Sequence, residues 1–71
     1  MNKAALKSVM VLHGDGNKEL AECLGISEQS VSAKINENGT EFKQGEIAKI
    51  IERYNLTAEQ IEAIFFAAEV S

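Results

Sequence analysis

The sequence predicts an all-α protein, a compact five-helix bundle that forms one domain over residues 1–71. Three observations support this fold class. Apolar residues recur three and four positions apart in each segment, as they do on one face of a helix. No segment alternates apolar and polar residues as a half-buried strand would. Glycine, asparagine, serine and threonine separate these segments at places where helices begin and end.

The first helix is expected over Lys3–Leu12, with Asn2 as its N-cap. Its inward face should carry Leu6, Val9 and Met10. The segment Gly14–Gly16 contains two glycines and an aspartate, and it is expected to end this helix.

Residues 17–36 are predicted to form two helices joined by a tight turn. The first has an apolar stripe at helical spacing, formed by Leu20, Ala21 and Leu24. Gly25 follows at a point where the helix must end in a residue that tolerates positive φ. Ser27 is a favourable N-cap for the second helix, and Ile26 is placed to pack against Val31 as a hydrophobic staple.

The second helix of this pair has two unlike faces. Val31 and Ile35 point inward together. The opposite side is uncharged and carries small or amide side chains, namely Gln29, Ser32, Ala33 and Asn36. Such a face suits the edges of DNA bases, because an amide can bond adenine at two points and a methyl group can contact thymine. The alternative interpretation is a solvated helix face, although such faces are usually rich in Lys and Glu.

Two further helices are expected after a loop. Asn38-Gly39 should close the preceding helix, and Phe42 should fill the core from the loop. The fourth helix, over Gln44–Tyr54, has a regular apolar stripe of Ile47, Ile50, Ile51 and Tyr54. A fifth helix over residues 58–69 is signalled by a capping box and a hydrophobic staple, formed by Thr57 with Gln60 and by Leu56 with Ile61.

The fifth helix has more apolar surface than its inward stripe requires. That stripe is Ile61, Ile64, Phe65 and Ala68. The surplus lies on other sides and consists of Phe66, Ala63, Ala67 and Val70. We interpret this surplus as a dimerisation surface. The alternative is that Phe66 covers a gap between the first and fifth helices.

Residues 17–36 resemble the helix-turn-helix of the phage Cro and repressor class of transcriptional regulators. The residues that match the pattern of this class are Ala21, Gly25, Leu20, Leu24, Ile26 and Val31. Two features depart from it. The aliphatic residue near the end of the second helix lies one position away from its usual place in this class, at Ile35 after Lys34. The loop over residues 37–40 is slightly longer than the usual short turn of this class.

The resemblance implies a small prophage-like repressor whose second motif helix lies in the major groove of double-stranded DNA. By position it implies base or near-base contacts from Ser27, Glu28, Gln29, Ser32, Ala33 and Asn36, and a phosphate contact from Asn17. Members of this class commonly dimerise through their last helices, which would place two recognition helices one DNA turn apart on a palindromic operator.

The net charge of −4 is unfavourable for DNA binding, because affinity for a duplex comes mainly from Lys and Arg. The acid is unevenly distributed, however. Residues 1–54 contain seven basic and eight acidic residues, and the three remaining acids all follow residue 58. Lys18, Lys34 and Lys43 are expected to reach phosphates, assisted by the amide groups at the start of the two motif helices. Glu28 either accepts from cytosine N4 or stabilises its helix N-terminus.

Other classes of function find little support. The carboxylates are scattered, and the single histidine, His13, has no evident nucleophile as a partner, so no enzyme is expected. Cys23 and His13 are interpreted as structural rather than as metal or redox groups, and neither a cofactor nor a small-molecule ligand is indicated. No apolar run is long enough for a membrane span, and no signal peptide is recognisable, so a cytoplasmic protein is expected.

The sequence therefore predicts a DNA-binding regulator of transcription that represses by occupying an operator. The rival hypothesis is a protein-interaction module, as an antirepressor would be, in which the scaffold is kept without DNA reading.

Overall fold

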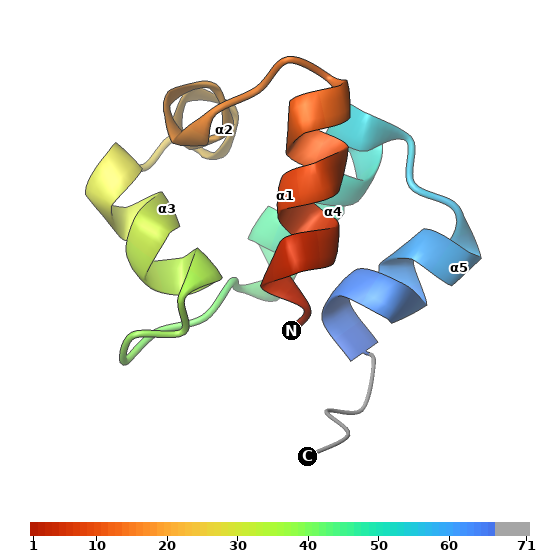
Figure 1. Cartoon of the computed structure of the whole chain (residues 1–71). Coiled ribbons are helices and arrows are strands. Elements are labelled where there is room, and N and C mark those ends of the chain that lie inside the picture. Colours follow the sequence, from red (N-terminus) through yellow and green to blue (C-terminus); the bar gives the residue numbers. More distant parts are fainter. Residues whose placement is uncertain (67–71) are drawn as a thin grey trace.

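The computed structural model describes residues 1–66, and every regular element in this part of the chain is helical. Figure 1 shows α1 in front of α4, with α3 and α5 on opposite sides of α1. The elements are α1 (Lys3–Leu12), α2 (Asn17–Leu24), α3 (Glu28–Ile35), α4 (Gln44–Tyr54), α5 (Ala58–Ile61) and the π-helical segment η1 (Glu62–Phe66). The all-α class and the bounds of the first and fourth helices are confirmed.

The first four helices end in the same way, with one residue in the left-handed region. Those residues are Gly14, Gly25, Glu37 and Asn55. In each case the next amide bonds a carbonyl five residues back, as in the Schellman motif. Gly25 takes φ 72°, as the sequence predicts. At the end of α3 the left-handed residue is Glu37, at φ 52°, where a side chain costs about 1–2 kcal/mol relative to a right-handed conformation. The helix ends at Ile35, before the predicted Asn38-Gly39.

The predicted N-caps of α1, α3 and α5 are confirmed. Asn2, Ser27 and Thr57 each accept a hydrogen bond from the amide three residues on, at 3.1, 3.1 and 3.2 Å. The starts of α2 and α4 are different, because the N-cap Gly16 has no side chain and the N-cap Lys43 has no acceptor for such a bond. There the carboxylates of Glu19 and Glu46 reach back to the amides of Gly16 and Lys43.

One apolar core joins all the helices. Its fully enclosed side chains are Leu6, Leu20, Val31, Ile35, Ile50 and Ile64. Burying one such side chain contributes about 1.5–3 kcal/mol, so these residues account for much of the stability of so small a domain. Phe42 is 8 % exposed and fills the core from the loop, as predicted. Ile47 and Ile51, predicted to be buried, are half-buried at its edge.

A polar cluster fastens the loop after α1 to the end of α4. The Asp15 carboxylate accepts two hydrogen bonds from Arg53, at 2.7 and 3.1 Å, and one from the Tyr54 hydroxyl at 2.7 Å. The ring of His13 lies 4.9 Å from that of Tyr54. The Asp15 side chain is only 8 % exposed. The hydrogen bonds from Arg53 and Tyr54 replace the water that its carboxylate loses on folding.

The cluster makes stability depend on pH. Hydrogen bonds from Arg53, opposed by burial and aided by Tyr54, hold the pKa of Asp15 below its ordinary value. The unfolded chain therefore binds this proton at a higher pH than the folded chain does. We expect the free energy of unfolding to fall as the pH drops below about 4. Urea titrations between pH 7 and pH 3 measure this slope. Asp15→Asn should flatten it and Tyr54→Phe should reduce it, whereas an unchanged slope in Asp15→Asn would contradict the assignment.

The fifth helix differs from the predicted regular α-helix. After Ile61 it widens into the π-helical turn η1, and the carbonyl of Ile64 accepts a 2.7 Å hydrogen bond from the amide of Asn2. This bond ties η1 to the start of α1, while Ile64 is buried and Phe65 is half-buried. Phe66 is 67 % exposed, so it does not cover a gap between α1 and α5.

The predicted dimerisation residues are only partly observed. Ala63 is exposed. Ala67 and Val70, and the predicted end of the helix at residue 69, lie outside the described residues. Up to Phe66, no helix is both long and apolar enough to cross a membrane.

Candidate nucleic-acid interface

The two faces of α3 differ as the sequence predicts. Val31 and Ile35 are buried, and α3 packs mainly against α2 across the turn at Gly25. On the other side, Gln29 and Asn36 are exposed, and Ser32 and Ala33 are half-buried. We call these four residues the α3 outer face. The structure therefore brings together the uncharged side chains that the sequence selects as base-contact candidates.

The two amides of the α3 outer face are in different states. Gln29 makes no side-chain hydrogen bond to any residue that the structure describes, so its amide is available to a ligand. Asn36 is engaged at both ends. Its Oδ1 accepts from Lys3 Nζ at 3.2 Å, and its Nδ2 donates to the carbonyl of Ser32 at 3.0 Å. A base contact by Asn36 would have to replace these bonds, whereas one by Gln29 would replace only water.

Ser27 and Glu28 lie at the start of α3, and both are exposed. The Ser27 hydroxyl accepts from the amide of Ser30 and donates to the Ser30 hydroxyl at 2.9 Å, so it is already used as a cap. Glu28 places a negative charge in the first turn, which stabilises the positive end of the helix dipole.

The structure contradicts the expectation that Lys34 is free to reach a phosphate. Lys34 is buried, with its side chain 10 % exposed, and its ammonium lies 2.7 Å from Oε1 of Glu46. The departure at the end of the motif explains this position. Both Lys34 and Ile35 face inward, so the lysine stem takes a place at the core edge and its charge needs an internal partner.

Two helix N-termini provide groups that can bind anions. Lys18 is exposed in the first turn of α2, beside the half-buried Asn17, and Lys43 is exposed as the N-cap of α4. Neither helix start is closed by an N-cap side chain. The carboxylates of Glu19 and Glu46 occupy the amides of Gly16 and Lys43, and the remaining amides of the first turns are left to donate to an anion. The sequence predicts this role for the starts of α2 and α3. The start of α3 is capped by Ser27, and the suitable second terminus is that of α4.

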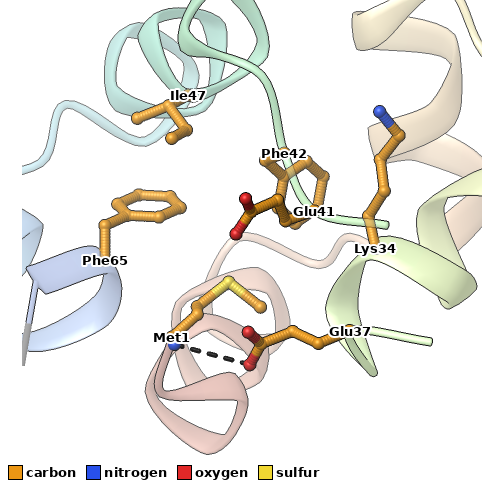
Figure 2. A pocket seen from close by; sticks show the side chains of 7 residues that line it. All are labelled: Met1, Lys34, Glu37, Glu41, Phe42, Ile47 and Phe65. Carbon is orange, nitrogen blue, oxygen red and sulfur yellow. Dashed lines mark hydrogen bonds and ion pairs between the residues drawn. The ribbon is translucent and has the colours of Figure 1, made fainter. Parts of the chain in front are cut away.

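Acidic groups and a small cavity lie beyond the end of α3. Figure 2 shows Glu37 and Glu41 beside Met1, whose amino group is 3.4 Å from Oε1 of Glu37. The cavity has a volume of about 80 Å³, large enough for water, and is lined by Met1, Lys34, Glu37, Glu41, Phe42, Ile47 and Phe65. Its lining is mixed, with apolar side chains, the carboxylates of Glu37 and Glu41, and two cationic groups that are each paired with a glutamate.

Several polar partners were not predicted from the sequence. Neither the pairing of Asp15 with Arg53 nor a role for Glu46, which neutralises the buried Lys34, was expected. Glu46 stands three residues after the N-cap Lys43, a capping-box position that could have drawn attention to it. Asp15 and Arg53 are 38 positions apart, and no local signal links them. The half-buried Cys23 is a free thiol. Within residues 1–66 no three His, Cys, Asp or Glu side chains form a group that could hold a metal ion.

The described residues form a small all-helical protein in which one helix has a neutral outer face. Residues 6–68 match the family described as a protein of unknown function, DUF739, so the chain belongs to that family. Comparison with curated proteins and with solved structures gave no match.

Proposed function

We propose that this protein is a sequence-specific regulator of transcription that binds double-stranded DNA. In this proposal α2, the turn at Gly25 and α3 form a helix-turn-helix of the phage Cro and repressor type, and α3 lies in the major groove. The observation that carries the proposal is the α3 outer face. It is neutral, accessible and rich in groups that read base edges, while the other side of the same helix is buried.

Phosphate contacts would come from both sides of this face. Lys18 and the first-turn amides of α2 would bind one strand, and Lys43 with the start of α4 would bind near the other end of α3. These groups are few, and the exposed Glu28, Glu37 and Glu41 oppose them. We therefore expect a modest affinity for one copy that falls as the salt concentration rises.

A homodimer would compensate for this modest affinity. Phe66 exposes 67 % of its surface on η1, and Figure 1 places α5 on the side of α1 opposite to α3. Recognition helices one DNA turn apart would each lie about 17 Å from a two-fold axis, half of the turn of about 34 Å. The extents of the protein are 30 × 27 × 21 Å, so one copy can span that distance. Repression by operator occupancy in the cytoplasm of a bacterial host would require binding alone.

The test is selection of binding sites from a random duplex pool at two salt concentrations, about 50 and 200 mM. We expect a palindromic motif whose half-sites are separated by about 10 base pairs. The selected site should bind more weakly at the higher salt concentration, because bound Lys side chains release counterions. A pool without enrichment at either concentration would contradict the proposal.

A second candidate function is that of a protein-interaction module, as an antirepressor would be. The specific observation in its favour is a solvent-exposed apolar set on two helices: Val11 and Leu12 on α1 are 74 % and 83 % exposed, and Phe66 on η1 is 67 % exposed. Under this alternative, changes on the α3 outer face would leave the biological effect intact, and Phe66→Glu would abolish it.

A further inference from the structure

Lys34 is the one basic residue that the fold buries within the described part of the chain. Its ammonium and the carboxylate of Glu46 are 2.7 Å apart, and their side chains are 10 % and 13 % exposed. Burial opposes ionisation of Glu46, but hydrogen bonds from Lys34 and from the amide of Lys43 outweigh it and hold the pKa of Glu46 below its usual range. The pair is therefore charged, and each ion depends on the other.

The pair joins the last turn of α3 to the first turn of α4. The oxygen of Glu46 that binds Lys34 also accepts from the amide of Lys43 at 2.9 Å. Among the residues that the structure describes, the bond from Lys34 to Glu46 is the only side-chain hydrogen bond between α3 and α4. Figure 2 shows the stem of Lys34 beside Phe42, with the ammonium directed away from Glu37 and Glu41. Lys34 therefore pairs with Glu46 on α4 and not with Glu37 or Glu41 in the loop before it.

The position of Lys34 around the helix axis gives this link a consequence. At about 100° per residue, Lys34 and Ile35 fall on either side of Val31, and Gln29 and Ala33 fall on the far side. Apolar contacts of Val31 and Ile35 are non-directional, whereas a charged hydrogen bond has a fixed length and angle. A rotation of about 20° would move a side-chain end about 5 Å from the axis by about 2 Å. Such a shift exceeds the tolerance of a hydrogen bond.

We propose that Lys34 and Glu46 are positioning residues, which fix the rotation of α3 and so aim Gln29 and Ala33 at the bases without contacting DNA themselves. This inference rests on the proposed DNA-reading function. It differs from a phosphate contact by Lys34, because a phosphate contact acts on every duplex equally, whereas a positioning pair acts on the preference between duplexes.

The experiment uses three full-length variants, Lys34→Met, Glu46→Gln and the double variant. Each single change leaves one buried ion without its partner and is expected to be destabilising. The double variant removes both charges at similar volume and leaves no buried ion without its partner, so it serves as the folded test protein. Urea titration establishes that it is folded. Its affinities for the selected operator and for a scrambled duplex are then measured over a range of salt concentrations.

For the double variant we expect the preference for operator over scrambled duplex to fall about tenfold, the loss of one good base contact. Affinity for the scrambled duplex and the salt dependence should stay as in the wild type. Two results would overturn the proposal. One is an unchanged preference in the folded double variant. The other is a uniform loss on both duplexes with the slope of log K against log salt reduced by about 0.9, which would make Lys34 a phosphate contact.

A measurement without DNA separates this proposal from the proposed function. Residual dipolar couplings of the α3 amides, measured against those of α1 and α2, report the orientation of α3 in the wild type and in the double variant. A changed orientation supports the positioning role, and identical couplings contradict it. If the wild type prefers no duplex in the pool selection, the proposed function fails, and the couplings still decide the role of the pair.

Discussion

Replacement of Gln29 by alanine is expected to reduce the preference for the selected operator by about tenfold to one-hundredfold per half-site, the range of one bidentate base contact. Gln29 is exposed in the first turn of α3, and its amide bonds no other residue that the structure describes. Because it is exposed, its loss should leave the fold and the affinity for a scrambled duplex unchanged. Fluorescence anisotropy measures the affinity for the operator and for the scrambled duplex, and the ratio of the two is the preference.

Two further variants sharpen this prediction. Gln44→Ala removes an exposed amide at the start of α4, outside the α3 outer face, and should preserve the preference. Asn36→Ala should have a smaller effect than Gln29→Ala, because the Asn36 amide already bonds Lys3 and the carbonyl of Ser32. An unchanged preference in Gln29→Ala would remove the main support for base reading and favour the protein-interaction module.

The parts of the fold that the sequence predicts best are those decided within a few residues. Asn2, Ser27 and Thr57 cap their helices through the amide three positions on, and Gly25 tolerates the positive φ that its turn needs. The α3 outer face also follows from local spacing, because Val31 and Ile35 fix which side of the helix is buried.

The features that escape prediction depend on partners distant in sequence. Lys34 precedes the buried Ile35 in the sequence, but the direction of the Lys34 side chain depends on Glu46, which lies twelve positions further on. Asp15 pairs with Arg53 across 38 positions, through the packing of the first loop against α4. The widened turn η1 occurs where the carbonyl of Ile64 binds the amide of Asn2, at the other end of the described chain. Helical periodicity contains no information about such contacts.

The second prediction with a large expected effect concerns Phe66. Phe66→Glu should lower the affinity for a palindromic operator by about 100-fold or more, since paired half-sites gain that much from a high effective concentration. Affinity for a single half-site should be nearly unchanged. Phe66 is 67 % exposed, so the substitution should leave the fold intact. Sedimentation velocity at several concentrations, with and without operator, measures the loss of the dimer.

Val11→Glu is the matched control, because it places the same charge at an apolar residue of α1 that is 74 % exposed. If η1 forms the interface, Val11→Glu should dimerise and bind the palindrome as the wild type does. The reverse result would place the interface on α1 and contradict the role of Phe66. If both variants keep the full affinity, neither surface holds two copies together. DNA affinity would then have to come from one copy. In one copy the favourable charges of Lys18, Lys43 and two helix N-termini are opposed by three exposed carboxylates, so its affinity should be modest. Full affinity in both variants would therefore be the result most damaging to repression by operator occupancy.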